Sequence, residues 1–374
     1  MDLTICAEFE NKEYFRALYH LQKKGKIDKI NIITTRFHHL IIQKICYNSS
    51  FLRKIIECLL KKKITHINPP LRKIADSCLI PFRLLKDKKI VVFIAPYHPL
   101  IYLLVIYRMI GKKYIYNTSW PDWSGNRYPN LALPFTKRLW SVFLKNNIVV
   151  TVSDKAEKDM KSLGVKCFRI PHSVDTKKFN ILEKRKGKEI RILFVGRLDE
   201  EKGIQIILDA SKKFKKSNVK FYFAGKGEYA EKIKSLEKEL PVKLLGYVDN
   251  EDMLVKIYND SDIFVLPSIS SNRWEELFGI VLIEAMSCGL PVIASDCVGP
   301  KEIIDNGKTG FVIPQNNVEE LVEKLDMLIN NKELREKMGI HGRQKAVRDY
   351  DLEKNSNEWY KILNIDYKRD YKNR

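Results

Sequence analysis

The chain has 374 residues, of which 45% are hydrophobic and 30% are charged, and its formal net charge is +21. That length allows two domains with separate cores, and the composition is globular, which excludes a disordered chain. No apolar run reaches the roughly 18 residues of a transmembrane helix, and seven scattered cysteines without a C-x-x-C pair argue against a disulfide framework or a structural zinc site.

Residues 1 to 152 alternate short apolar runs with amphipathic stretches. The apolar runs, which predict buried strands, are residues 3–6, 30–34, 90–94, 114–117 and 148–152. The stretches that predict helices are residues 12–24, 50–60 and 100–110. Such alternation is typical of a parallel sheet with helices on both faces, and ligands of these folds gather at the carboxyl ends of the strands.

The positive charge lies entirely in the first half of the chain. Residues 1–187 contain 36 Lys and Arg against 14 Asp and Glu, whereas residues 188–374 contain 31 against 32. Lysine clusters such as residues 61–63, 86–89 and 112–113 would attract anionic lipid headgroups or a phosphorylated acceptor. A merely solvated lysine-rich surface is the alternative. The sequence contains no nucleic-acid recognition motif, so we expect no nucleic acid partner.

A polar join at residues 183–188 separates the first series from a second alternating series. The strands predicted in the second series are residues 190–195, 219–224, 242–245, 263–266, 292–294 and 311–313, with helices between them. Helical stretches after residue 318 close this domain, and residues 350–365 predict a last helix that is free to cross back.

Residues 274–289, WEELFGIVLIEAMSCG, place two carboxylates around the start of an apolar helix. Glu276 precedes the helix, Gly279 marks its start, and Glu284 lies inside it on the face of Ile280. The N–H groups and positive dipole end of such a helix suit a diphosphate. Eight residues span roughly 12 Å along a helix, wider than the roughly 5 to 9.5 Å of a glycosidase pair, so we expect the two carboxylates to hold a sugar hydroxyl and a ribose diol of one ligand.

The loop after the predicted strand at residues 190–195 has the sequence GRLDEEKG. Gly196 allows close approach of a ligand, and Arg197 and Lys202 place two positive charges at the carboxyl end of this strand. A leaving-group phosphate is the natural partner for these charges. Gly225 follows the predicted strand at residues 219–224, and Val248 comes shortly after the predicted strand at residues 242–245. Val248 offers its backbone N–H and C=O groups, so the identity of its side chain is not informative.

These motifs together resemble retaining glycosyltransferases of GT-B fold, of the family 4 (glycosyl transferases group 1) type. ELFGIVLIE at residues 276–284 fits the E-x7-E signature without a gap, and residues 196–203 resemble the family's G-R-x4-K-G element. Residues 224–228 resemble its G-x-G segment, and residues 246–248 resemble the position that packs the nucleotide base. The resemblance covers most of the second half of the chain and little of the first.

The resemblance implies an α/β fold of GT-B class, in which two Rossmann-like doubly wound domains face a central cleft and a C-terminal helix crosses back to the first domain. We expect an acceptor-binding domain at residues 1–180, a nucleotide-sugar-binding domain at residues 188–348, and the returning helix with a polar tail at residues 349–374. The residues that it implies for catalysis are Glu276, Arg197, Lys202 and His98. The residues that it implies for donor binding are Gly196, Gly225, Val248, Phe278, Gly279, Ile280 and Glu284.

The first half departs from the family pattern. Residues 7–10, AEFE, stand where many relatives carry a Gly-Gly loop for the donor phosphates. His98 follows a predicted strand at the place where relatives keep a histidine near the reacting sugar, and a packed or capping histidine is the alternative. Trp120 and Trp123 either form a sugar-stacking wall or belong to the core.

The function implied is transfer of a hexose from a nucleotide diphosphate sugar to a glycan or lipid-linked acceptor, in the assembly of cell-surface glycans, glycolipids or glycoproteins. We expect no cofactor beyond the donor and no metal, because no carboxylate cluster suits Mg²⁺. The N-terminus has no basic n-region, so we expect a cytoplasmic protein or one peripheral on the inner face of the membrane. The alternatives are a nucleotide-sugar epimerase of the same fold and a basic, non-catalytic membrane or nucleic-acid binding module.

Overall fold

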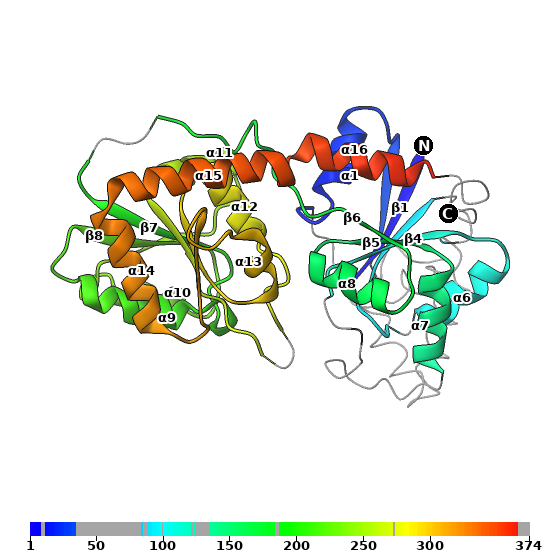
Figure 1. Ribbon diagram of the computed structural model, residues 1–374, viewed down its shortest axis with the longest axis horizontal. Helices are drawn as coiled ribbons and strands as arrows, with labels where there is room; N and C mark the ends of the chain where they lie inside the picture. The colour runs from blue at the N-terminus through cyan, green and yellow to red at the C-terminus, as the bar shows by residue number, and fades with distance from the viewer. Residues whose placement is uncertain are drawn as a thin grey trace, which may run out of the picture. The chain divides into compact units, whose positions relative to one another are not determined.

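The computed structural model describes residues 1–8, 12–34, 84, 89–98, 100–120, 123, 135–183, 187–271 and 274–365. The chain forms two compact units, each built on one six-stranded parallel sheet (Figure 1). Unit 1 is Met1–Ile170 with Ser356–Arg374, and unit 2 is Pro171–Asn355. Within the ranges described, no helix is long and apolar enough to cross a membrane. The expected helix at residues 50–60 and the lysines at residues 61–63 lie outside these ranges.

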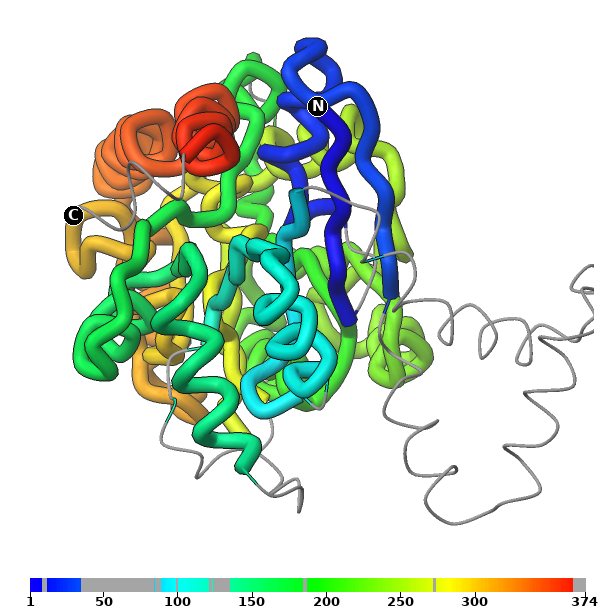
Figure 2. The backbone as a smooth tube through the Cα atoms, turned by 90° about the vertical axis from the view of Figure 1, so that its right-hand side faces the viewer, coloured from blue at the N-terminus to red at the C-terminus, as the bar shows by residue number. Residues whose placement is uncertain are grey.

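The strands of unit 1 follow the order β2-β1-β3-β4-β5-β6, and every neighbouring pair is parallel. They are β1 (Asp2–Ala7), β2 (Lys29–Thr34), β3 (Ile90–Phe93), β4 (Tyr114–Thr118), β5 (Ile148–Thr151) and β6 (Cys167–Arg169). Figure 2 shows β1 and β2 side by side in blue. The first five lie at the apolar runs expected from the sequence. The edge strand β6 was not expected, because its three residues include no buried side chain that would mark it.

The helices of unit 1 are α1 (Arg16–Lys23), α6 (Ile101–Met109), α7 (Thr136–Lys145) and α8 (Asp154–Ser162). The start of α8 shows why these residues are helical. The hydroxyl of Ser153 accepts a hydrogen bond from the backbone N–H of Ala156 at 3.2 Å, which caps the helix. Asp154 and Glu157 in the first turn complement the helix dipole.

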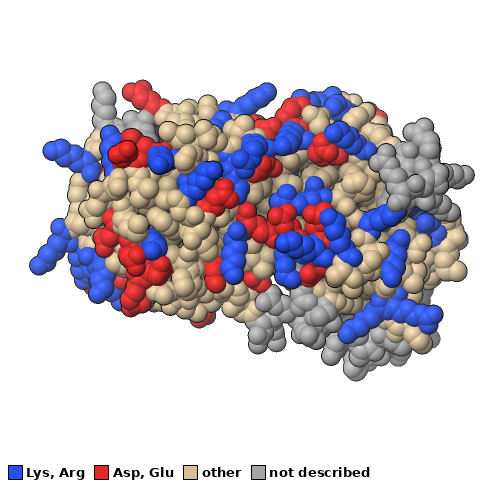
Figure 3. Space-filling model, viewed as in Figure 1, with Lys and Arg blue, Asp and Glu red and all other residues tan. Residues whose placement is uncertain are grey.

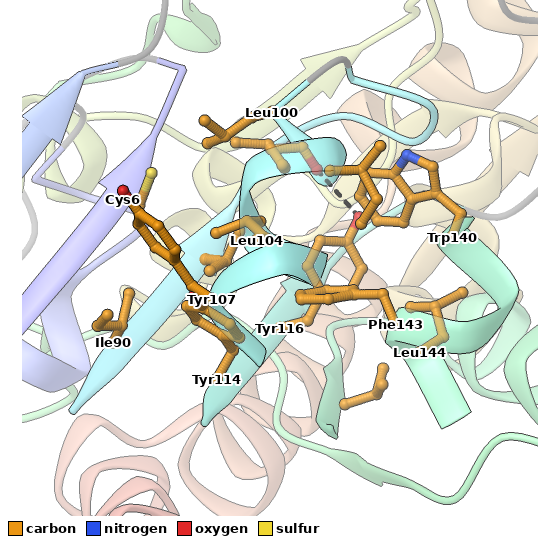
Figure 4. Close-up of a cluster of buried hydrophobic side chains, with 14 of the residues drawn as sticks. Cys6, Ile90, Leu100, Leu104, Tyr107, Tyr114, Tyr116, Trp140, Phe143 and Leu144 are labelled. Atoms are coloured by element: carbon orange, nitrogen blue, oxygen red, sulfur yellow. Dashed lines mark hydrogen bonds between the residues drawn. The ribbon is translucent and has the colours of Figure 1, made fainter. Parts of the chain in front are cut away.

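Aromatic side chains fill the core of unit 1 between the sheet and the helix pair α6 and α7 (Figure 4). The ring of Tyr116, from β4, meets Trp140 of α7 edge to face at a centroid distance of 5.3 Å. The hydroxyl of Tyr116 donates a hydrogen bond to the carbonyl of Ile94 at 3.0 Å, so this polar atom is satisfied inside the core. Trp123 packs into the same cluster, 5.6 Å from Trp140, and is buried. The core interpretation of Trp123 therefore holds, and the sugar-stacking interpretation is wrong for this residue.

The strands of unit 2 follow the order β12-β11-β10-β7-β8-β9 and are also parallel throughout. They are β7 (Ile190–Val195), β8 (Val219–Ala224), β9 (Val242–Gly246), β10 (Ile263–Leu266), β11 (Val292–Ser295) and β12 (Gly310–Ile313). All six lie at the apolar runs expected from the sequence. Most of their side chains are buried, since both faces of the sheet are covered by helices.

The helices of unit 2 are α9 (Ile204–Ser211), α10 (Ala230–Leu236), α11 (Glu251–Asn259), α12 (Ile280–Ser287), α13 (Val298–Ile303), α14 (Val318–Asn330) and α15 (Lys332–Tyr350). Three of them begin at an asparagine whose side chain accepts hydrogen bonds from first-turn N–H groups, as N-caps do. These caps are Asn250, Asn317 and Asn331.

The boundary between the units differs from the expected one, because residues 171–180 belong to unit 2 rather than to unit 1. The N–H of Val174 donates to the carbonyl of Tyr350 at 2.9 Å, and Val174 accepts from Leu352 at 3.0 Å. Arg343 of α15 donates to the carbonyl of Phe179 at 2.6 Å. These hydrogen bonds attach the connecting segment to the end of α15, which no local sequence pattern reveals.

The last helix, α16 (Leu352–Leu363), begins in unit 2 and continues into unit 1 from Ser356. Trp359 stacks on Phe93 of β3 at a centroid distance of 6.4 Å. The ammonium group of Lys26 donates to the side-chain oxygen of Asn357 at 3.3 Å. The chain end is thus fixed to the first sheet by packing and hydrogen bonding.

Candidate functional site

The candidate site lies where the strand order of unit 2 reverses. From β7 the chain moves to β8 on one side, and later returns to β10 on the other side of β7. Loops that diverge from adjacent strands leave a crevice at their carboxyl ends, which is the usual ligand position in doubly wound sheets. The two loops concerned are residues 196–203, after β7, and residues 267–279, after β10.

These two loops touch at Gly203. This residue has a φ of 69°, and a Cβ atom built on it would lie 1.9 Å from the carbonyl oxygen of Pro267. Only glycine therefore fits this conformation and this contact. A hydrogen bond of 2.8 Å from the N–H of Ile269 to the carbonyl of Glu201 joins the loops a second time. The side chain of Asp199 accepts from the N–H of Lys202 at 3.1 Å and caps the short 3-10 turn that carries this lysine.

Lys202 and Glu276 form an ion pair across the two loops. Their side chains are only 14% and 11% exposed, so the charges are largely removed from water. The hydroxyl of Ser268 donates a further hydrogen bond to the same carboxylate oxygen at 3.3 Å. The structure therefore brings together two residues that the sequence placed 74 positions apart.

Backbone contacts hold Glu276 in this position. Its carbonyl accepts a hydrogen bond of 2.9 Å from the N–H of Gly299. A Cβ atom at Gly299 would lie 2.4 Å from backbone atoms of Phe278, so a glycine is required for the approach of α13. The carboxylate of the neighbouring Glu275 accepts from the N–H of Val298 at 3.1 Å, at the start of α13. The two adjacent glutamates thus have different surroundings.

Arg197 lies at the exposed side of the ion pair. Its guanidinium contacts Asp199 at 2.8 Å and Glu201 at 3.4 Å, and its side chain is 58% exposed. The guanidinium carbon lies 5.9 Å from the ring centroid of Trp274, and the ammonium of Lys202 lies 4.9 Å from the same centroid. Trp274 thus gathers both cations around one ring. Trp274 is the first residue of the segment 274–289, but the sequence alone predicts no role for it.

Helix α12 begins beside Glu276. Gly279 is its N-cap, with a φ of 92°, and the cap residue offers no side chain to the helix end. The side chains of Phe278 and Ile280 on either side are buried, so this turn is fixed by packing. The first-turn N–H groups and the dipole of this helix favour negative charge in front of it.

Glu284 lies farther along α12 and is buried. Its carboxylate accepts a hydrogen bond of 3.2 Å from the hydroxyl of Tyr258, which comes from α11. The expected contact of Glu284 with a ribose stays a prediction.

Glycines allow the backbone to pack closely where β7, β8 and β9 end. A Cβ atom at Gly225 would lie 1.8 Å from the carbonyl oxygen of Gly196, and the N–H of Gly225 donates to Gly246 at 2.8 Å. Val248 follows β9 and is half-buried. Beside it, the ammonium of Lys226 lies 4.2 Å from the ring centroid of the exposed Tyr247. Neither of these two residues was singled out from the sequence, where a lysine between glycines was the available signal.

In unit 1, His98 follows β3 and is buried. Its Nδ1 accepts a hydrogen bond of 3.1 Å from the N–H of Leu100, at the start of α6, so the neutral ring carries its proton on Nε2. Glu8, after β1, accepts a hydrogen bond of 2.5 Å from the N–H of Ala95. A carboxylate therefore occupies the loop in which many relatives carry a Gly-Gly pair. The catalytic role of His98 stays a prediction, beside this capping contact.

Comparison with known proteins gives the family of unit 2 and the fold of the chain. Residues 175–345 match the family model described as glycosyl transferases group 1. An uncharacterized glycosyltransferase of Haemophilus influenzae is 33% identical over 233 residues, which are 61% of this chain and 58% of that protein. A phosphatidyl-myo-inositol mannosyltransferase of Mycobacterium leprae is 32% identical over 54% of each chain. The chain thus spans little more than half the length of these curated relatives.

Two solved structures resemble the whole chain. Anabaena Alr3699/HepE in complex with UDP has a TM-score of 0.70 at 17% identity, over 97% of this chain and 99% of that one. A glycosyltransferase from Rickettsia africae has a TM-score of 0.70 at 19% identity, over 100% and 99%. The expected GT-B fold is confirmed by these likenesses and by the two parallel sheets. The segment from residue 175 to residue 345 is therefore a domain of the glycosyl transferases group 1 family, carried on a GT-B fold.

Proposed function

We propose that the protein is a retaining glycosyltransferase that moves a hexose from a nucleotide diphosphate sugar to an acceptor hydroxyl, in glycan or glycolipid assembly. The observation that carries this proposal is the Lys202–Glu276 pair, which lies at the switch point of the sheet beside the start of α12. The family of residues 175–345 and the glycosyltransferase relatives support the same class of reaction.

The diphosphate of the donor is the group best suited to this corner of unit 2. Lys202, Arg197 and the N-terminus of α12 all present positive charge there. Negative charge develops on the leaving diphosphate as the bond to the sugar breaks, and fixed positive groups stabilise it in the transition state. The departing phosphate oxygen then accepts the proton of the attacking hydroxyl.

Donor binding would exchange the partner of Lys202. A phosphate that takes over the ammonium group releases the carboxylate of Glu276, which is then available to accept a hydrogen bond from a sugar hydroxyl. The hydroxyl of Ser268 keeps the carboxylate oriented during this exchange. The remaining donor positions are those of the sequence prediction: Gly196, Gly225, Val248, Phe278, Gly279, Ile280 and Glu284. We further propose that turnover needs no metal and no cofactor, so that EDTA leaves the rate unchanged.

The test is release of nucleotide from UDP-hexoses and GDP-mannose by the full chain, with and without a glycan or lipid acceptor. Glu276→Gln should lower kcat by at least about 100-fold, since catalytic hydrogen bonds to charged groups contribute on that scale. Glu275→Gln is the matched control, because its carboxylate faces Val298 instead. A normal rate in Glu276→Gln would contradict the assignment.

The same assay separates the alternatives. An epimerase would interconvert UDP-sugars with no acceptor present. A non-catalytic module would release no nucleotide under any condition. The retaining stereochemistry is checked separately, by NMR of the anomeric proton of the product, where inversion would refute that part of the proposal.

A further inference from the structure

Helices α6 and α7 of unit 1 lie side by side (Figures 1 and 2). Hydrogen bonds at both ends show that they run in the same direction. Near their beginnings, the hydroxyls of Tyr102 and Thr136 are hydrogen-bonded at 2.8 Å. Near their ends, the guanidinium of Arg108 donates to the carbonyl of Asn146 at 3.2 Å. Two contacts at matching positions fix the pair as one two-helix surface.

This surface exposes large aliphatic side chains. In α6 and the turn after it, Ile106, Met109 and Ile110 are 56%, 82% and 65% exposed. Their spacing of three and four residues places them on one side of the helix, one turn after Tyr102. In α7, Val142 is 46% exposed. The opposite side of α6 is already buried in the core, so this helix is apolar on both sides.

Basic residues surround the aliphatic side chains, and acidic ones are absent from these stretches of sequence. Residues 101–120 and 135–153 together contain six Lys and Arg and no Asp or Glu. Arg138 and Lys145 lie on the same side of α7 as Val142, while Lys112 and Lys113 follow Ile110 after one glycine. In Figure 3, blue side chains stand among uncharged ones at the lower right, where Figure 1 places α7.

We propose that the α6–α7 surface docks on an anionic lipid bilayer, with Met109 and Ile110 entering the interfacial layer and the basic side chains on the headgroups. The combination of exposed aliphatic tips with one sign of charge fits a membrane surface best. A second copy of the chain would bring like charges together, and nucleic acid would leave the aliphatic tips without an apolar partner. This surface belongs to unit 1 and the donor-site residues to unit 2, so the proposal does not rest on the proposed function.

The experiment is vesicle flotation of the full chain with phosphatidylcholine alone and with added phosphatidylglycerol, at low and high salt. We expect binding only to the anionic vesicles, weakened by salt. Arg138→Glu/Lys145→Glu should weaken binding by at least about 30-fold, as expected for the loss of two membrane-facing charges. Met109→Asp/Ile110→Asp should abolish it, and the high exposure of both side chains makes unfolding an inadequate explanation once thermal unfolding is shown to be unchanged.

The matched control is Lys213→Glu/Lys216→Glu, which changes the net charge equally on exposed residues of unit 2. We expect this variant to bind like the unaltered chain. The proposal is overturned if the control loses as much binding as the α6–α7 variants, or if neutral and anionic vesicles bind alike. It is also overturned if size-exclusion chromatography shows a dimer that Met109→Asp/Ile110→Asp disrupts. A chain that binds added RNA but does not bind anionic vesicles would overturn it as well.

Discussion

Replacing the partners of the Lys202–Glu276 pair, singly and together, measures how strongly this pair joins the two loops. Lys202→Met removes the ammonium and leaves the carboxylate of Glu276 with a hydrogen bond of 3.3 Å from the hydroxyl of Ser268. Glu276→Gln keeps the shape and leaves the ammonium over the ring of Trp274. The double variant removes both charges.

The expected magnitudes follow from the burial of the pair. Removing one partner of a buried ion pair costs about 3–5 kcal/mol, and the residual exposure of 14% and 11% places Lys202→Met near the lower end, at about 3 kcal/mol. Glu276→Gln should cost about 2 kcal/mol, because the ring of Trp274 still attracts the lysine. We expect a coupling energy of about 2 kcal/mol, so that the double variant costs about 3 kcal/mol rather than the sum.

Urea unfolding followed by circular dichroism provides the free energies. The Lys212–Asp209 pair is a matched control in the same unit, because its side chains are 57% and 34% exposed at a separation of 2.6 Å. Lys212→Met and Asp209→Asn should each cost less than about 1 kcal/mol. A Lys202→Met variant that costs no more than Lys212→Met, with coupling below about 0.5 kcal/mol, would refute the buried-pair reasoning.

Gly203→Ala should destabilise the chain by at least about 3 kcal/mol, because its Cβ would lie 1.9 Å from the carbonyl oxygen of Pro267 and the residue has a positive φ. Gly307→Ala is the control in thermal unfolding. Gly307 has a φ of 77° but no atom within 4 Å of the added Cβ, so this variant should cost only about 1–2 kcal/mol. Equal losses would contradict the loop contact. Burial raises the pKa of Cys288 to about 12, whereas an unfolded thiol titrates near about 8.5. The folded chain then holds a proton that the unfolded chain has lost, so this thiol should contribute a fall in stability of about 1.4 kcal/mol per pH unit above about pH 9, and Cys288→Ala should show a slope shallower by that amount in urea unfolding. His98→Asn should keep a side-chain acceptor for the N–H of Leu100 and hence normal stability, whereas His98→Ala should lose about 1 kcal/mol. An equal fall in turnover in both variants would support catalysis by Nε2. A fall in the alanine variant alone would show that His98 only caps the start of α6.

Most of the fold could be predicted from the sequence because buried parallel strands carry continuous apolar runs. The second sheet is the clearest case, since each run from residue 190 onward became a strand. The edge strand β6 escaped prediction because an exposed, three-residue strand carries no such signal. The boundary at residue 171 escaped because it depends on hydrogen bonds to α15, far away in the sequence.

The residues of the candidate site could also be predicted only in part. Arg197, Lys202, Glu276 and Gly279 were identified from local motifs, because each sits at the end of a strand or the start of a helix. Trp274, which gathers both cations, was missed because an aromatic residue beside a loop is equally typical of a core. Contacts between residues far apart in the sequence, such as the ion pair itself, appear only once the sheet order is known.

The central claim, that unit 2 holds the diphosphate of a nucleotide sugar through Arg197 and Lys202, is tested most directly by nucleotide binding. Thermal unfolding is measured with UDP, GDP, ADP and their sugars. The second readout is the change in tryptophan fluorescence that is lost in Trp274→Phe, because the ring of Trp274 lies beside both cations. A ligand at a hundred times its Kd stabilises the folded chain by about 2.7 kcal/mol. We predict a shift with one nucleotide family that is lost in Arg197→Ala. No shift with any of them, or a shift that Arg197→Ala leaves intact, would contradict the claim.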